Sequence, residues 1–245
     1  MIIVHLVDDI PTLKACSLTC YSWYITTLPH IHRTLVLRSS NSGLRALSNL
    51  HALGLLPFTK EIRILQPAVK PHWFLPHDFF YHPNSRHFFA LTNVQSLAVQ
   101  DLDMLFFAST FMLYFGHLSP TLRSLTLDEP RCTSLQLSQF ISSFPNLDDL
   151  VIRDFTPLQH YIDPKSIPFS APKLGGKLVL VSSDVAWEHF AVAYGLRFKS
   201  VHAGGVIGHV PALLAACAET LETFEIDLIP DGGMRPCVHL TMNLS

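Results

Sequence analysis

The chain has 245 residues, of which 49% are hydrophobic and 15% are charged, and its formal net charge is −2. This apolar content excludes an intrinsically disordered chain, because enough side chains are present to form a buried core. The nearly neutral charge excludes proteins that bind nucleic acid or anionic membranes through a strongly basic surface.

The first 38 residues differ from the rest of the chain and predict a small all-helical module. Ile10-Pro11 favours a helix start, since proline is tolerated in the first turn. The residues that then fall on one helical face are Leu13, Cys16, Ser17 and Cys20. The apolar signal continues through Trp23 and Leu28. We therefore predict a helical domain over residues 1–38 and a second domain over residues 39–245.

A Leu-x-x-Leu-x-Leu pattern recurs through the second domain at nearly constant intervals. The copies are Val94-Leu97-Val99, Leu122-Leu125-Leu127, Leu147-Leu150-Ile152 and Leu221-Phe224-Ile226, and Leu174-Leu178-Leu180 carries one inserted residue. If Val201 divides the longest gap, the central residues 97, 125, 150, 178, 201 and 224 are 28, 25, 28, 23 and 23 residues apart. A period of about 20–29 residues is typical of leucine-rich-repeat solenoids, whose units bury their apolar faces by stacking. The sequence predicts an α/β solenoid with short parallel strands near residues 35, 62, 97, 125, 150, 178, 201 and 224.

Helical periodicity precedes several of these strands. The clearest stripe, with i, i+3, i+4, i+7 spacing, consists of Leu137, Phe140, Ile141 and Phe144. Further helices are expected within residues 44–50, 107–114, 187–194 and 210–217. Residues 66–89 and 157–172 contain repeated prolines and are predicted to be long loops.

The residues between the leucines define a candidate binding surface, because side chains alternate between the two faces of a strand. The outward set comprises Gln95, Ala98, Arg123, Thr126, Asp128, Asp148, Asp149, Arg153, Glu222, Glu225 and Asp227. Its C-terminal end is acidic and favours a basic partner; the alternative is that these side chains are only exposed to solvent. Replacing an outward residue such as Asp149 by alanine is expected to cost less than about 0.5 kcal/mol.

No pattern favours catalysis, a cofactor or a metal ion. The histidines at 72, 77, 82 and 87 are five residues apart, so no two share a helix face, and zinc ligands usually stand closer. No Gly-x-Ser-x-Gly or phosphate-loop motif is present. The longest apolar stretch, residues 104–115, is shorter than the roughly 20 residues of a membrane-spanning helix. We expect a protein that is not an enzyme and that has no nucleic-acid or membrane partner.

Two segments carry a resemblance to a known family. Leu13-Lys14-Ala15-Cys16-Ser17-Leu18-Thr19-Cys20-Tyr21-Ser22-Trp23 resembles the middle of an F-box, an apolar helix that closes on Cys-x-x-Trp, and residues 29–37 resemble its close. Residues 114–125 resemble the leucine-rich tails of divergent F-box proteins that are abundant in mushroom-forming fungi. Together these resemblances cover nearly the whole chain.

The resemblance implies a non-catalytic substrate-recognition subunit of a cullin-RING (SCF-type) ubiquitin ligase. In that family the F-box binds a Skp-type adaptor and the repeats hold a protein substrate. The residues that match the apolar positions of the motif, and hence the adaptor-binding candidates, are Leu6, Leu13, Leu18, Cys20, Trp23 and Ile31. The alternative is a leucine-rich-repeat interaction scaffold without adaptor binding. A cytoplasmic or nuclear location fits five cysteines without paired spacing.

The sequence departs from the family pattern in several places. The Leu-Pro pair and helix that open the family motif would lie upstream of Met1, so we expect an N-terminally truncated F-box with weak adaptor binding. The repeats have Leu102, Pro130, Phe155 and Ile229 where the standard repeat has asparagine, so the turns after the strands must satisfy their backbone groups in another way. Residues 238–245 look like a strand that is cut off without a polar cap.

Overall fold

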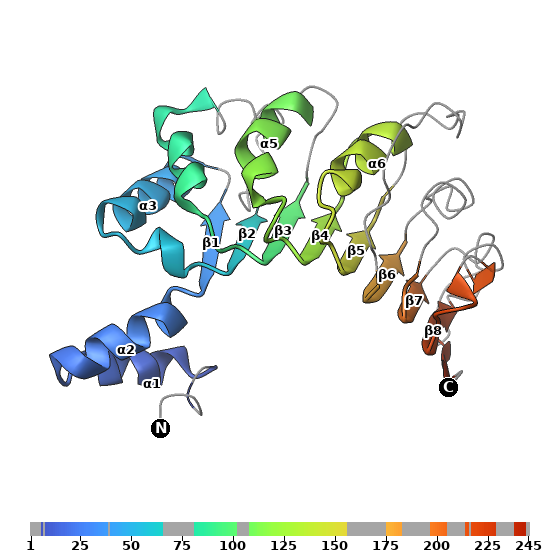
Figure 1. Cartoon of the computed structure of the whole chain (residues 1–245), viewed down its shortest axis with the longest axis horizontal. Helices are drawn as coiled ribbons and strands as arrows, with labels where there is room; N and C mark the ends of the chain where they lie inside the picture. The colour runs from blue at the N-terminus through green and yellow to red at the C-terminus, as the bar shows by residue number, and fades with distance from the viewer. Residues whose placement is uncertain are drawn as a thin grey trace.

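The computed structural model describes residues 6, 8–38, 40–65, 81–101, 108–155, 175–182, 197–204, 214–215, 217–228 and 238–243. Within these residues the chain is an α/β protein built around a nine-stranded open sheet, whose strands follow the order of the sequence from one edge to the other (Figure 1). The pairings from β1 to β8 are parallel, and β8 pairs with β9 in the antiparallel sense. The strands are β1 (Thr34–Arg38), β2 (Glu61–Leu65), β3 (Ser96–Gln100), β4 (Ser124–Asp128), β5 (Asp149–Arg153), β6 (Lys177–Val181), β7 (Ser200–Gly204), β8 (Thr223–Leu228) and β9 (Val238–Asn243).

The central leucines of the repeated pattern lie opposite one another across the sheet. Leu97 pairs with Leu125, Leu125 with Leu150 and Leu150 with Leu178. In β1–β7 the second and fourth residues of each strand are buried, and the other positions are more exposed. The strands lie at all eight predicted positions and in the predicted order, because the period-2 pattern and the turn signals both occur in each segment.

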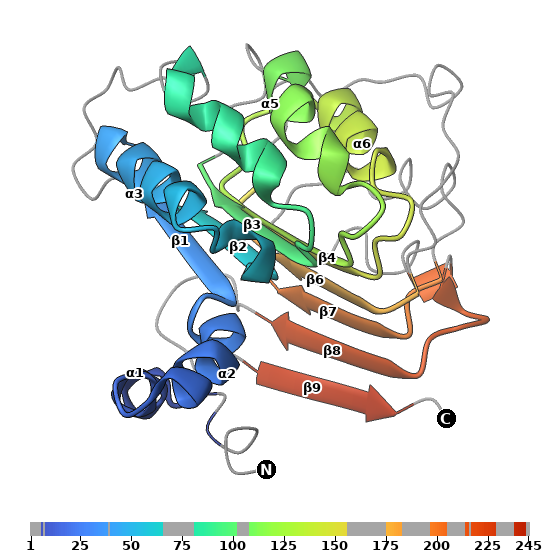
Figure 2. The same ribbon diagram turned by 60° about the vertical axis from the view of Figure 1, so that its left-hand side comes forward.

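The helices that follow the strands cover one face of the sheet (Figures 1 and 2). They are α3 (Asn41–Ala52), α5 (Ala108–Phe115) and α6 (Ser134–Ser142). Thr133 and Gln136 begin α6 with a reciprocal capping box: the Gln136 N–H donates to Thr133 Oγ1 at 3.2 Å, and the Thr133 N–H donates to Gln136 Oε1 at 3.0 Å. The predicted apolar stripe is buried: Leu137, Phe140 and Ile141 lie on α6, and Phe144 follows the end of the helix. The helix predicted over residues 187–194 lies outside the described residues.

The prediction of a loop over residues 66–89 is wrong for its last part. Residues Pro83–Ala90 form a 3₁₀ helix, η3, in which Phe88 is fully buried and packs against Phe115 with ring centroids 5.2 Å apart. His82 begins η3, since its Nδ1 accepts a hydrogen bond from the Asn84 N–H at 3.1 Å. Few residues of η3 face the core, so the sequence shows no apolar stripe here. Residues 66–80 and the predicted loop 157–172 lie outside the described residues.

A ladder of backbone hydrogen bonds joins consecutive units where their strands begin. The carbonyl of Lys60 accepts two hydrogen bonds from the next unit, from the N–H groups of Gln95 at 2.7 Å and Ser96 at 3.0 Å. The carbonyl of Gln95 then accepts from Arg123 at 2.8 Å and Ser124 at 2.9 Å. Equivalent carbonyls belong to Arg33, Arg123, Gly176 and Lys199. This ladder fixes the start of each strand on the one before it, whatever the length of the segment between them.

A second backbone ladder joins consecutive units where the strands end, and it answers how the turns satisfy their backbone groups without asparagine side chains. The residue after each of four strands has left-handed backbone geometry, with φ values of 55° at Asp101, 50° at Glu129, 50° at Asp154 and 47° at Ser182. Each of these residues donates its N–H to the last carbonyl of the next strand, at 2.7–3.0 Å. The turns therefore satisfy their backbone groups through main-chain bonds. Pro130 and Phe155, which stand where the standard repeat has asparagine, are buried.

The inserted residue before β6 changes the ladder at this one step. The carbonyl of Asp148 accepts only from the Gly176 N–H, at 3.1 Å, and the Lys177 N–H donates instead to Asp149 Oδ1 at 2.8 Å. A Cβ atom at Gly176 would collide with this carboxylate and with the Asp148 carbonyl, so the close approach requires glycine. Asp149 faces outward, as predicted, but it also supplies the acceptor that the backbone lacks.

The C-terminal strand runs in the opposite direction to the rest of the sheet. β9 pairs with β8 over six residue pairs, from Thr223 opposite Asn243 to Leu228 opposite Val238. The predicted strand over residues 238–245 is therefore present, and its antiparallel sense is not visible in its sequence. β9 covers the edge of β8, which would otherwise present its N–H and C=O groups without partners.

The alternation of buried and outward residues predicts unequal effects for two neighbours in β4. Leu125→Ala should lower the free energy of unfolding by about 2–5 kcal/mol, because Leu125 is fully buried and a cavity would remain. Thr126→Ala, on the outward side of the same strand, should cost less than about 1 kcal/mol. Urea denaturation followed by circular dichroism measures both values, and similar losses for the two variants would contradict the assignment of the two faces.

The bond from Lys177 to Asp149 predicts a second contrast. Asp149→Ala should cost about 1 kcal/mol, more than its outward position alone suggests, because the Lys177 N–H loses its acceptor. Asp148→Ala is the matched control and should change stability by less than about 0.5 kcal/mol, since the Asp148 side chain is exposed. Thermal unfolding of the two variants tests the difference. If Asp148→Ala is as destabilised as Asp149→Ala, the bond from Lys177 to Asp149 does not explain the loss.

Candidate protein-interaction surfaces

A pair of helices precedes the sheet and stands apart from its helical layer (Figures 1 and 2). These helices are α1 (Ile10–Ser17) and α2 (Tyr21–Ile31). Asp9 caps α1: its carboxylate accepts hydrogen bonds from the hydroxyl of Thr12 at 2.7 Å and from the Thr12 N–H at 3.1 Å, and both bonds hold the pKa of Asp9 below its ordinary value. Cys20 lies in the turn and begins α2, so the prediction that Cys16 and Cys20 share one helix face is wrong.

Four large side chains of the helix pair are exposed, and we define them as the exposed apolar face: Leu18, Tyr21, Tyr24 and Ile25. Leu18 is 87% exposed and Tyr21 is 78% exposed, while Tyr24 and Ile25 are exposed by 42% and 47%. Tyr21, Tyr24 and Ile25 have i, i+3, i+4 spacing and therefore lie on one side of α2. Exposed apolar side chains that are contiguous in this way mark interaction sites on soluble proteins.

The structure divides the six predicted adaptor-binding residues into two groups. Leu13 is fully buried between the helices, and Leu6 and Ile31 are half-buried. Leu18, Cys20 and Trp23 are exposed. The motif comparison missed Tyr21, Tyr24 and Ile25, although their helical spacing is visible in the sequence and could have identified them.

The predicted binding surface on the sheet separates into residues on the open face and residues at its edge. Seven candidates lie on strands and point away from the buried positions: Ala98, Thr126, Asp128, Asp149, Arg153, Glu225 and Asp227. The pKa of Asp128 is raised, mainly because the carboxyl group is partly buried. The other four, Gln95, Arg123, Asp148 and Glu222, are exposed but directly precede strands and lie along the edge where the strands begin. The eleven predicted residues are therefore divided between the sheet face and this edge, because the first residue after each leading apolar residue is not yet part of the strand.

A histidine that the sequence pattern did not single out lies between two of the predicted acidic residues. The His202 ring, on β7, has Nδ1 3.1 Å from Glu225 Oε2 and Nε2 2.9 Å from Asp227 Oδ2, both on β8. Nearby, Lys199 Nζ is 3.0 Å from Glu222 Oε1. The carboxylates at the acidic C-terminal end of the predicted surface thus already have partners within the chain, which weakens the case for a basic ligand there.

Metal and membrane sites can be assessed only within the described part of the chain. There, no group of three His, Cys, Asp or Glu side chains is close enough to hold a metal ion. Of the four evenly spaced histidines, His87 stacks on His51 with ring centroids 4.1 Å apart, and His72 and His77 lie outside the described residues. No helix in the described ranges is both long enough and apolar enough to cross a bilayer.

The contacts of His202 predict a stability effect. His202→Ala should lower the free energy of unfolding by about 1 kcal/mol, because Glu225 and Asp227 lose the ring that separates their carboxylates. Adding Glu225→Gln and Asp227→Asn to this variant should recover part of the loss, since the amides carry no charge. Chemical denaturation at neutral pH measures the free energy of unfolding of the parent, the single variant and the triple variant. If His202→Ala is as stable as the parent, the contacts of His202 are not stabilising.

Comparison with known proteins does not identify a family. No protein-family model matches the sequence. No curated protein matches it either.

Proposed function

We propose that the chain is a non-catalytic substrate-recognition subunit of an SCF-type ubiquitin ligase. In this proposal α1 and α2 bind a Skp-type adaptor, and the sheet with its helices is a leucine-rich-repeat solenoid that holds a protein substrate. The observation that carries the proposal is the exposed apolar face of Leu18, Tyr21, Tyr24 and Ile25 on the segment that resembles an F-box. Such a subunit acts in the cytoplasm or nucleus, where its thiols stay reduced.

The apolar face favours a protein partner on energetic grounds. Fully burying one large apolar side chain stabilises a complex by roughly 1.5–3 kcal/mol, and about 1.4 kcal/mol corresponds to a tenfold change in affinity. Leu18 and Tyr21 are both more than three-quarters exposed, so nearly all of this free energy is available to a partner. Leu13 and Thr27 of the same helix pair are fully buried, so the exposure is confined to other positions of the two helices.

The arrangement of the sheet supports the solenoid part of the proposal. Strands in the order of the sequence, each started by the carbonyl of the unit before it, are what stacked repeats require. Between one strand and the next the segments differ in length, yet the register does not change. The outward side chains of β4 and β5, such as Thr126 and Arg153, are then available to a substrate.

A second candidate function is a leucine-rich-repeat interaction scaffold that does not bind an adaptor. One observation favours it: of the six residues that match the F-box motif, Leu13 belongs to the core of the helix pair, and Leu6 and Ile31 are only half-exposed. The remaining apolar face is small for stable binding by itself. Both candidates are binding functions, and they differ only in the partner of α1 and α2.

Adaptor binding distinguishes the two candidates. Isothermal titration of a purified Skp-type adaptor against the chain should show weak binding, and fusing the opening Leu-Pro helix of an F-box upstream should strengthen it at least about tenfold by adding apolar area. In the fused protein, Leu18→Asp with Tyr24→Asp should abolish the complex.

Leu113 provides the matched control, because it is 63% exposed and lies on α5, in the helical layer from which the helix pair stands apart (Figure 1). Leu113→Asp should leave the affinity unchanged. If the fused protein does not bind the adaptor, or if the double variant binds as well as the parent, the scaffold function is the better explanation.

A further inference from the structure

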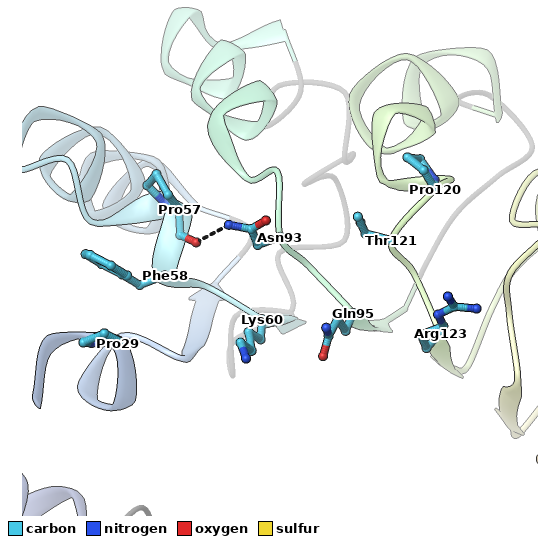
Figure 3. A pocket seen from close by; sticks show the side chains of 9 residues that line it. All are labelled: Pro29, Pro57, Phe58, Lys60, Asn93, Gln95, Pro120, Thr121 and Arg123. Atoms are coloured by element: carbon cyan, nitrogen blue, oxygen red, sulfur yellow. Dashed lines mark hydrogen bonds between the residues drawn. The ribbon is translucent and has the colours of Figure 1, made fainter. Parts of the chain in front are cut away.

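An open groove of about 520 Å³ lies where the first strands begin, beside the C-terminal end of α2 (Figure 3). Successive segments of the chain contribute to it in turn: α2, the 3₁₀ helix η2 (Leu56–Phe58), and the residues that lead into β2, β3 and β4. Its lining residues are Pro29, Pro57, Phe58, Lys60, Asn93, Gln95, Pro120, Thr121 and Arg123. Arg123 and Gln95 were predicted to bind a partner; the sequence pattern did not predict that Lys60 joins them.

The backbone ladder sets the spacing of the polar side chains in this groove. Lys60, Gln95 and Arg123 are equivalent residues of consecutive units, since the carbonyl of each of the first two accepts the N–H of the next. Neighbouring strands are about 4.8 Å apart, so the backbones of Lys60 and Arg123 are separated by roughly 10 Å. The three residues therefore form a row that crosses the strand starts.

The groove carries positive charge without a balancing carboxylate among its lining residues. Lys60 is exposed, and the Arg123 side chain is 54% exposed. Arg123 Nη1 donates to the carbonyl of Asn146 at 3.1 Å and lies 3.9 Å from an Asp148 carboxylate oxygen, so the guanidinium is oriented but not enclosed. A guanidinium has five N–H donors, which leaves several of them for a ligand.

The end of the groove near α2 is apolar, and its wall is held by a hydrogen bond between two units. Pro29 and Phe58 lie at the end near α2, beside Lys60 (Figure 3). The Asn93 side-chain amide donates to the Pro57 carbonyl at 2.8 Å, which ties the third unit to the second. Apolar side chains at one end of a row of cations suit a ligand that presents a bulky apolar residue followed by negative charges.

We propose that this groove binds an extended acidic peptide segment of a protein partner. A bulky apolar side chain of the segment packs against Pro29 and Phe58, and two carboxylates lie over Lys60 and Arg123. An extended chain advances about 3.3 Å per residue, so carboxylates three residues apart span the roughly 10 Å between the two cations. Under the function proposed above, on which this identification of the partner rests, the segment belongs to the substrate; the binding itself requires no adaptor.

The probe is a fluorescein-labelled peptide, Gly-Ser-Glu-Ser-Ser-Glu-Phe-Glu-Ser-Ser-Glu-Ser-Gly, whose symmetry allows either chain direction. Fluorescence anisotropy with the full chain and no adaptor should give saturable binding that weakens with added salt. Lys60→Glu and Arg123→Glu should each weaken binding at least about tenfold, Phe58→Ala should weaken it about fivefold, and Asp148→Asn should strengthen it about twofold. Circular dichroism verifies that each variant is folded. If a glutamate variant does not fold, Lys60→Gln or Arg123→Gln takes its place, with an expected loss of affinity of about threefold.

Arg45, an exposed arginine on α3, is the matched control, and Arg45→Glu should bind the peptide like the parent. Several results would overturn the proposal: no saturation at 500 µM peptide, equal binding of a peptide with glutamine in place of glutamate, or equal losses for Arg45→Glu and Arg123→Glu. Tighter binding of a ten-nucleotide oligothymidine would identify a nucleic-acid site instead. The peptide assay contains no adaptor, so a failure of the peptide to bind leaves the proposed adaptor binding by α1 and α2 untouched. A failure of adaptor binding likewise leaves the proposed peptide groove untouched.

Discussion

The structure depends on one hydrogen-bonding constraint that recurs at the start of almost every strand. The carbonyl just before a strand accepts the N–H groups of two consecutive residues in the next unit, as Gln95 does for Arg123 and Ser124. This arrangement fixes both the position and the register of the next strand. Since a shift of one residue would turn every buried side chain outward, the ladder also places the core leucines. The segments between strands can then vary in length without loss of the core.

The exceptions to this constraint show how the chain accommodates irregular units. At β6 the inserted residue displaces one bond of the ladder, and the Asp149 carboxylate supplies the missing acceptor while Gly176 permits the close approach. After the strands, Asp101 and Glu129 adopt left-handed backbone geometry, which is uncommon for residues with a Cβ atom. Both positions bond to the next strand through their N–H groups, which offsets the strain. Residues that depart from the repeated pattern are therefore tolerated where the main-chain hydrogen bonds are complete.

The two interaction surfaces that we propose follow from this construction. Parallel strands in sequence order place equivalent residues in rows, so that Lys60, Gln95 and Arg123 lie side by side although their positions in the sequence differ by 63. The apolar face of α2 is different, because it depends on one helix rather than on repetition. α2 connects the two surfaces, since its last turn contributes Pro29 to the groove while Tyr21 and Tyr24 lie nearer its start. A partner on the helix pair and a peptide in the groove would thus be held close together.

The sequence by itself determined the features that arise from local periodicity. The alternation around Leu97, Leu125 and Leu150 identified the strands and their buried positions, and the stripe from Leu137 to Phe144 identified α6. Both patterns report which side of one element is apolar, and the hydrophobic effect acts on that side in any fold.

Only the tertiary structure decided which distant residues meet. It placed Leu13 inside the helix pair and Leu18 outside, enclosed His202 between two carboxylates, and brought Lys60 into the row with Arg123. It also turned β9 antiparallel to β8. These outcomes depend on the register between segments that are tens of residues apart. Main-chain hydrogen bonds fix this register, and because every residue type except proline can both donate and accept them, they leave almost no signal in the sequence.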